Sequence, residues 1–200
     1  MSLINVEKIS VADQQHYPDS LFPLVYASQS NTDSNAVARW IQQHKSKIEA
    51  ELETNGAVLF RGFGVVDDQG FDGFIRAFGW PSFTYEESLS NAVRHNRTEL
   101  VFTANEAPPS VSIFLHHEMA QTPIYPSKLF FFCEQAPEVG GATPICRSDV
   151  LLEHLQKEVP NFVKSCETKG IRYSQTMPAE NDLESGQGRS WANTLSASNI

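Results

Sequence analysis

The stretch from Phe114 to Ala120 restricts what this chain can fold into more than any other, because two histidines and a glutamate interrupt an apolar run there. In a β-strand, successive side chains point to opposite faces of the sheet. If the stretch is a strand, His116 and Glu118 share one face, and His117 lies on the other face among apolar neighbours. An imidazole and a carboxylate on one face supply two of the three ligands of a 2-His-1-carboxylate site for non-haem Fe(II).

The spacing of these residues alone is a weak signal, and other interpretations stay open. A histidine and a glutamate two residues apart often form an ordinary polar patch on a strand. Zinc favours four-coordinate sets of histidine, cysteine and carboxylate, but the sequence has no His-Glu-x-x-His motif and no cysteine near His116. His117 and Glu118 would converge on one ion only across a bulge. The strand period therefore favours His116 with Glu118 and gives His117 a packing or supporting role.

Composition narrows the class of protein. The 15 Lys and Arg against 24 Asp and Glu give a formal net charge of −9, which disfavours nonspecific attraction to nucleic acid or to an anionic membrane. No apolar run approaches the length of a membrane span, and the N-terminus lacks the pattern of a signal peptide. The three cysteines, Cys133, Cys146 and Cys166, follow no regular spacing. A reduced, cytoplasmic protein is the simplest explanation of this pattern. We expect no nucleic-acid or membrane partner.

Residues 1–55 are expected to form an N-terminal arm and a helix. Pro23 makes the one apolar run of the arm an edge strand or an extended segment rather than a central strand. From Asp33 or Ser34 onward, apolar side chains recur at three- and four-residue steps, and Gly56 ends the pattern with a left-handed cap. His44 lies on the apolar stripe, where a structural histidine is expected.

The rest of the chain predicts short strands mixed with helices. Strand candidates are residues 57–60, 83–85, 100–103, 128–133, 142–146 and 171–173. Helices are expected from Asp67 or Asp68 to Phe78, after an N-cap at Ser148, and around Phe162 and Val163. The strands are not spaced as βαβ units, so an antiparallel sheet or barrel covered by helices is favoured over a doubly wound parallel sheet.

Four segments, taken in order, resemble one family. They are Gly56-Ala57-Val58-Leu59-Phe60-Arg61-Gly62-Phe63, Glu106-Ala107-Pro108-Pro109, His116-His117-Glu118-Met119-Ala120 and Gly140-Gly141-Ala142-Thr143-Pro144. Their order and separation are similar to those of the TauD/TfdA-like Fe(II)/2-oxoglutarate-dependent dioxygenases. The glutamate at 118, followed by Met-Ala, resembles the branch that contains clavaminate synthase and the SyrP-type amino-acid hydroxylases. By itself, the turn that leads into Thr143 would carry no functional weight.

The resemblance implies a mainly β fold with flanking helices, a double-stranded β-helix or jelly roll that is incomplete in this chain. Residues 1–200 would then be a single, partial dioxygenase domain. It implies that His116 and Glu118 bind Fe(II) and that Thr143 hydrogen-bonds a carboxylate of the co-substrate 2-oxoglutarate. The implied reaction hydroxylates an amino-acid-like small molecule, free or carrier-bound, while 2-oxoglutarate yields succinate and CO₂. Ser112 is a candidate substrate contact, although an ordinary strand serine is the alternative.

The chain departs from the family in its last third. In the family, a second metal-binding histidine and an arginine that anchors 2-oxoglutarate lie much later, but no histidine follows His154 here. Arg172 and Arg189 are the only later arginines, and neither follows a suitable histidine. We therefore expect a C-terminally truncated chain with weak iron binding. A non-catalytic remnant or binding module of the same fold is the alternative, and a zinc hydrolase is a third hypothesis.

Overall fold

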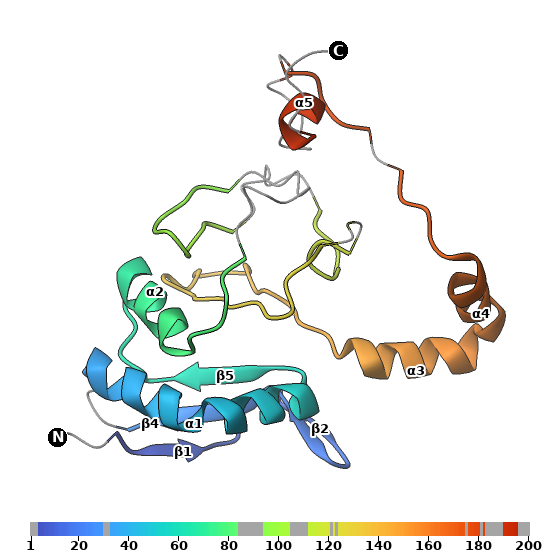
Figure 1. Ribbon diagram of the computed structural model, residues 1–200. Coiled ribbons are helices and arrows are strands. Elements are labelled where there is room, and N and C mark those ends of the chain that lie inside the picture. The colour runs from blue at the N-terminus through green and yellow to red at the C-terminus, as the bar shows by residue number, and fades with distance from the viewer. Residues whose placement is uncertain are drawn as a thin grey trace. The chain divides into compact units, whose positions relative to one another are not determined.

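A computed structural model describes most of the chain, which divides into two compact units (Figure 1). The described residues are 4–29, 33–83, 94–104, 112–120, 122, 124–174, 176–180, 182 and 190–195. The first unit takes its described residues from the ranges 1–82, 97–101 and 130–137. The second unit takes its described residues from the ranges 83–96, 102–129 and 138–200.

The first unit is built on a three-stranded sheet. Its strands are β1 (Val6–Lys8), β4 (Leu24–Ser28) and β5 (Val58–Arg61), in the order β1-β4-β5. Strand β4 is central, since it pairs antiparallel with β1 and parallel with β5. A separate antiparallel hairpin joins β2 (Gln15–Tyr17) to β3 (Ser20–Phe22).

Two expectations for this sheet are wrong. Pro23 lies between β3 and β4, outside both strands, so its missing N–H leaves the hydrogen bonds of a central strand intact. Helix α1 (Ser34–Asn55) connects β4 to the parallel strand β5, so these three elements form one βαβ unit. The sequence pattern missed this unit because it assigned the first strand to an edge.

Helix α1 begins and ends where the sequence predicts. The Asp33 carboxylate caps the first turn by accepting a hydrogen bond from the backbone N–H of Asn35 at 2.8 Å. At the other end, Gly56 has φ 78° and donates its N–H to the carbonyl of Leu52. The last helical residue, Asn55, is buried and accepts a hydrogen bond from the N–H of Leu21 at 2.7 Å, which ties the helix end to β3.

One face of α1 supplies the core of the first unit, and the helix lies along the sheet (Figure 1). Val37, Trp40, Ile41 and Ile48 are buried on this face. Trp40 meets Tyr26 of β4 edge-on, with 5.4 Å between ring centroids. The predicted structural role of a histidine on this stripe is confirmed, because His44 is half-buried, stacks on Trp40 and hydrogen-bonds its carbonyl.

Helix α2 (Asp68–Ala77) completes the core with aromatic side chains. Asp67 caps it through a 2.8 Å hydrogen bond from the N–H of Gly70. Phe74 and Phe78 pack against Phe60 of β5. Two residues of the 130–132 segment also reach this region, as Phe130 contacts Phe78 and Trp80, and Phe132 stacks on Phe71.

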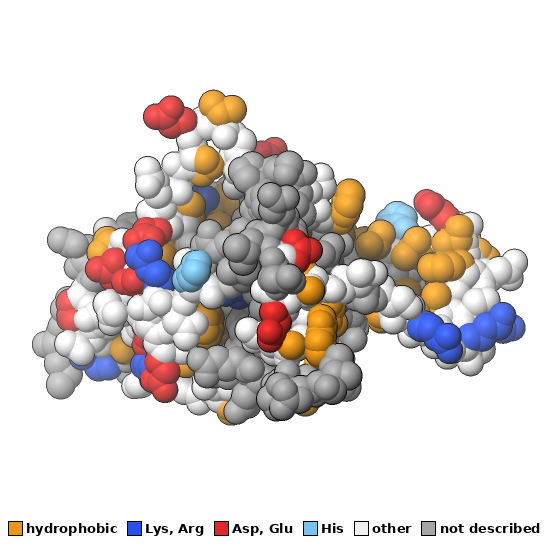
Figure 2. Space-filling view, turned by 90° about the horizontal axis from the view of Figure 1, so that it is seen from above, with side chains coloured by type: hydrophobic (Ala, Val, Ile, Leu, Met, Phe, Trp, Pro, Cys, Tyr) orange, Lys and Arg blue, Asp and Glu red, His pale blue; other side chains and the backbone are white. Residues whose placement is uncertain are grey.

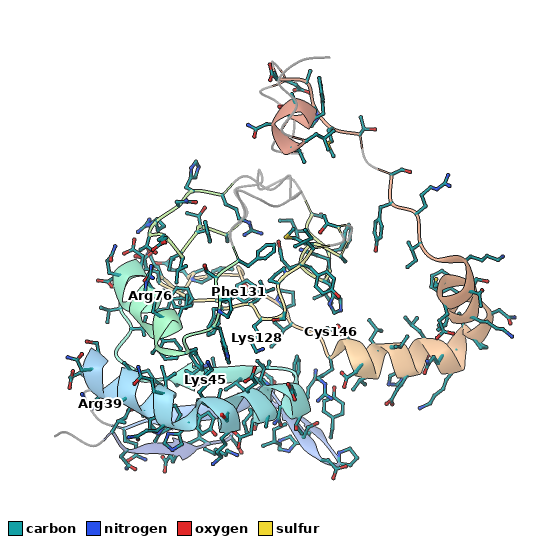
Figure 3. The ribbon with its side chains drawn as sticks, viewed as in Figure 1. Arg39, Lys45, Arg76, Lys128, Phe131 and Cys146 are labelled. Carbon is teal, nitrogen blue, oxygen red and sulfur yellow. The ribbon has the colours of Figure 1, made fainter. Side chains whose placement is uncertain are left out.

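Asp72 joins α2 to the segment at 97–101. It is buried, and its carboxylate accepts hydrogen bonds from the guanidinium of Arg76 and the hydroxyl of Thr98. Arg76 lies on the same helix one turn later (Figure 3) and also pairs with Glu99 at 2.7 Å. The segment is therefore held by charge and hydrogen bonds in the place where the sequence predicted a strand.

The second unit contains helices and irregular chain in its described residues. The helices are α3 (Ser148–Glu158), α4 (Pro160–Lys169) and the short α5 (Trp191–Thr194). Ser148 is the first helical residue and Arg147 takes the cap position, one residue before the expected cap. Apolar side chains gather on the surface of α3 and α4, at the right of Figure 2; those exposed by more than two fifths include Leu151, Leu152, Val159 and Phe162.

Several expected strands are not strands in the described residues. Segments 128–133, 142–146 and 171–173 have no strand pairing. Phe131, labelled in Figure 3, is 71% exposed rather than covered on both faces. A strand forms only against a partner, and the described residues place no neighbouring strand beside these segments. Small sheets with helices are compatible with the expected fold, but the complete double-stranded β-helix stays a prediction. Among the described residues, no helix is long and apolar enough to cross a membrane.

Candidate functional site

The predicted iron ligands lie in an extended segment that ends in a turn. Residues 112–117 have no strand pairing, and a turn covers 118–120. Met119 has a φ of 60° and its side chain is 3% exposed, so it anchors this turn in the second unit. The strand expected over 114–120 is therefore wrong in detail, because the left-handed residue breaks the period of two.

His116 and Glu118 nevertheless come together. The Nε2 atom of His116 lies 3.9 Å from Oε2 of Glu118. The other ring nitrogen, Nδ1, lies 2.7 Å from the carbonyl oxygen of Phe114. Because a carbonyl oxygen only accepts hydrogen bonds, this contact places a proton on Nδ1. In the neutral ring, Nε2 is then the nitrogen that is free to bind a metal. Histidines that bind metals are commonly oriented in this way.

The carboxylate of Glu118 also has a charged neighbour. The Nη2 atom of Arg94 lies 3.4 Å from its Oε1 atom. The side chains of Arg94 and Glu118 are 17% and 15% exposed, whereas that of His116 is 56% exposed. The acid is thus shielded from water on the arginine side, and the histidine opens toward solvent.

The distance between Nε2 of His116 and Oε2 of Glu118 is compatible with two of the three protein ligands of a metal site. Two atoms that both lie about 2.1 Å from one ion are at most about 4.2 Å apart, and about 3.0 Å apart when their bonds are perpendicular. The observed 3.9 Å falls within the first limit, and a perpendicular arrangement needs the two atoms to approach by about 0.9 Å. Within the described ranges, no three histidine, cysteine or acidic side chains gather around one position. His116 and Glu118 can therefore supply two ligands, and a third must come from elsewhere.

The other predicted site residues are not joined to this pair. Thr143 is exposed and lies in irregular chain before α3, and Ser112 is exposed as well. Among the described residues, the hydrogen bonds and ion pairs of His116 and Glu118 reach Phe114 and Arg94, not these hydroxyls. The assignments of Thr143 and Ser112 stay predictions.

His117 does not pack in the core. Its side chain is exposed, while Met119, two residues later, is buried. The carbonyl of His117 accepts a hydrogen bond from the N–H of Ala120 at 3.2 Å. Its backbone therefore helps to close the turn. The expected packing role of the side chain is wrong, and its supporting role beside the metal ligands stays a prediction.

Arg94 is the residue at this site that the sequence did not indicate. It lies in a polar stretch before the 97–101 segment, typical of a surface loop, and 24 residues before its partner Glu118. No motif joins the two positions. The sequence offers one signal, the polar stretch at residues 88–97, because a long polar loop in a compact protein often contributes to a binding site.

Comparisons with known proteins place these residues in a family context. Residues 19–193 match the family described as "Taurine catabolism dioxygenase TauD, TfdA family". A clavaminate synthase-like protein of Arabidopsis thaliana is 37% identical over 191 residues, which cover 92% of this chain and 57% of that protein. The dapdiamide synthesis protein DdaC of Enterobacter agglomerans is 30% identical over 161 residues, covering 80% and 47%. The chain thus spans about half the length of the curated relatives it matches.

Proposed function

Because this chain belongs to the TauD/TfdA family, we propose that it carries two of the three protein ligands of the iron site of an Fe(II)/2-oxoglutarate-dependent oxygenase. The observation that carries the proposal is the pair of ligand atoms, Nε2 of His116 and Oε2 of Glu118, turned toward each other at 3.9 Å. The family match covers both residues, and the tautomer of His116 suits metal binding. Residues 1–200 are then a partial domain of the jelly-roll fold.

Each proposed site residue has a defined task. His116 offers a neutral nitrogen, and Glu118 offers a negative oxygen that offsets part of the charge of the ion. Thr143 is proposed to donate a hydrogen bond to a carboxylate of 2-oxoglutarate, and Ser112 is a candidate contact for the substrate. When bound, iron, 2-oxoglutarate and O₂ supply the oxidant: one oxygen atom enters succinate as CO₂ leaves, and the other enters the substrate as a hydroxyl group.

The proposed substrate is an amino-acid-like small molecule, free or carrier-bound. Support comes from the names of the two relatives, a clavaminate synthase-like protein and a dapdiamide synthesis protein. No nucleic acid or membrane partner is proposed, because the net charge is −9. A cytoplasmic location is proposed from the irregular spacing of the three cysteines.

Two observations favour a second candidate, a binding module that keeps part of the fold without turnover. The described residues bring two potential ligands together, not three, and they leave large apolar side chains such as Phe114 exposed. Both features suit a chain that holds iron weakly. Both candidates predict little or no turnover by these 200 residues. They differ in the state of the isolated chain, because a remnant with uncovered apolar surface should dimerise or aggregate, which size-exclusion chromatography measures.

The test is 2-oxoglutarate-dependent formation of succinate by the chain, purified anaerobically and supplied with Fe(II) and O₂. We expect weak iron binding and little or no succinate from these 200 residues alone. Burst or steady turnover at the level of a complete enzyme would contradict this and show that a third ligand within the chain was missed. Turnover that survives unchanged in Glu118→Gln, with His154→Ala as an exposed-histidine control, would overturn the assignment of the site.

A further inference from the structure

We propose that Arg94 is a positioning residue that keeps Glu118 a one-oxygen ligand of the metal, an inference that rests on the proposed iron site. Arg94 acts through Glu118, by occupying the carboxylate oxygen that does not face His116.

The two oxygens of Glu118 have different neighbours. Oε2 lies 3.9 Å from Nε2 of His116, and Oε1 lies 3.4 Å from Nη2 of Arg94. The second distance is longer than the about 2.7–2.9 Å typical of a charge-assisted hydrogen bond, so the contact is mainly electrostatic. One oxygen of the carboxylate is thus near an imidazole, and the other oxygen is near a guanidinium.

The side chains of this ion pair are less exposed to solvent than those of the arginine pairs on the surface of the described part of the chain. Both of its side chains are at most 17% exposed. In the pairs that Arg76, Arg97 and Arg147 make with described carboxylates, at least one partner is 47% exposed or more. A shielded pair is less screened by water and salt, and an acid left without its partner there is costly. The pair of Arg94 with Glu118 is therefore the most shielded of these pairs, although its 3.4 Å contact is longer than the 2.7 Å contact of Arg76 with Glu99.

The restraint has a consequence for coordination. A carboxylate that binds an ion through both oxygens fills two positions, and one that binds through a single oxygen fills one. The proposed site needs open positions for the co-substrate and oxygen. A guanidinium on Oε1 competes with the metal for that oxygen and leaves Oε2 beside the imidazole. Partners of this kind, outside the ligand set, commonly orient metal ligands.

Simple charge neutralisation is the competing explanation. Under it, Arg94 only offsets the charge of a shielded acid, and replacing it changes stability but not how Glu118 binds the metal. The two explanations therefore differ in the number of positions that Glu118 occupies on a bound ion. That number can be measured without turnover.

The experiment uses Mn(II) as the probe, bound to the chain in the absence of 2-oxoglutarate. A six-coordinate ion on two protein ligands holds about four waters, and the relaxation rate of water protons per bound ion reports their number. In Arg94→Met, which keeps the aliphatic stem and removes the charge, we expect this rate to fall by about a quarter as Glu118 takes a second position. In Arg94→Lys, and in the exposed control Arg172→Met, we expect no change.

A second measurement does not depend on any arginine variant folding. The separation of the two carboxylate stretching bands in the metal-induced infrared difference spectrum is wide for one-oxygen binding and narrow for two-oxygen binding. Bands that vanish in Glu118→Gln belong to this residue. We expect the wide separation in the unmodified chain. A narrow separation there, or an unchanged relaxation rate in a folded Arg94→Met, overturns the inference.

The same series separates this inference from the function on which it rests. If His116→Ala and Glu118→Gln bind Mn(II) as tightly as the unmodified chain, the iron site itself is wrong. If both lose the metal but Arg94→Met leaves hydration and affinity unchanged, only the role of Arg94 is wrong.

Discussion

The imidazole of His116 and the carboxylate of Glu118 face each other at 3.9 Å across the start of a turn. Met119 lies within this turn. Its side chain is only 3% exposed, and its φ of 60° is in the left-handed region. A buried residue in a left-handed conformation persists only where its surroundings fix it. Packing of Met119 therefore helps to set the backbone around the proposed ligands.

Replacing Met119 is expected to loosen the proposed site. Met119→Ala removes a buried side chain and should lower the free energy of unfolding by about 2 kcal/mol, and Fe(II) binding should weaken with it. Met119→Leu keeps the apolar volume and is the matched control. Equal iron affinity in all three chains would show that the turn does not position the ligands.

Gly62 is expected to tolerate no side chain. Its φ is 72°, and an added Cβ would lie 2.5 Å from the carbonyl oxygen of Ser28. Gly79 has a similar φ of 60° with open space around it. Gly79→Ala should cost about 1 kcal/mol for the left-handed backbone, and Gly62→Ala distinctly more. Urea unfolding compares the two, and equal costs would contradict the close approach to β4.

Asp72 is expected to make stability depend on pH. Burial alone would raise the pKa of Asp72, but hydrogen bonds from Arg76 and Thr98 outweigh burial and hold its pKa below 3.8. Because the folded pKa is depressed, this stabilisation is present above the ordinary pKa and is lost as pH falls through the folded pKa. Thermal unfolding should be measured from pH 6 downward for the unmodified chain and for Asp72→Asn. Below pH 4, the unmodified chain should lose stability more steeply than the variant.

The control for this prediction is Asp149, an exposed acid on α3. Its Arg147 partner lowers the pKa of Asp149 to about 2, but the Asp149 side chain is 63% exposed, so the pair contributes little to stability. Asp149→Asn should follow the pH profile of the unmodified chain. If Asp72→Asn follows it too, the buried hydrogen bonds are not what holds the 97–101 segment.

Alanine substitutions at the neighbouring residues Phe130 and Phe131 are expected to differ sharply in their effect on stability. Phe130 contacts Phe78 and Trp80, whereas the side chain of Phe131 is 71% exposed. Phe130→Ala should lower the free energy of unfolding by about 2 kcal/mol, and Phe131→Ala by less than about 0.5 kcal/mol. A large effect at Phe131 would indicate that a partner or another part of the protein covers it.

The sequence predicted those features that depend on nearby residues. The bounds of α1 follow from a capping aspartate, an apolar stripe and a glycine at position 56, all within one segment. The proximity of His116 and Glu118 was also predicted, although a turn produces it and not a strand.

Features that depend on distant partners were missed. Strand pairing at 128–133 or 142–146 needs an adjacent strand, which a single segment cannot specify. The parallel pairing of β4 with β5 depends on a 22-residue helix folding back between them. The contact of Arg94 with Glu118 joins positions 24 residues apart, and no periodicity connects them.

The central claim is that His116 and Glu118 together bind the metal, and anaerobic equilibrium binding of Fe(II) tests it most directly. The unmodified chain and His154→Ala should bind one ion with equal, weak affinity, whereas His116→Ala and Glu118→Gln should each lower that affinity at least tenfold, which is about 1.4 kcal/mol. Unchanged affinity in either ligand variant would contradict the claim.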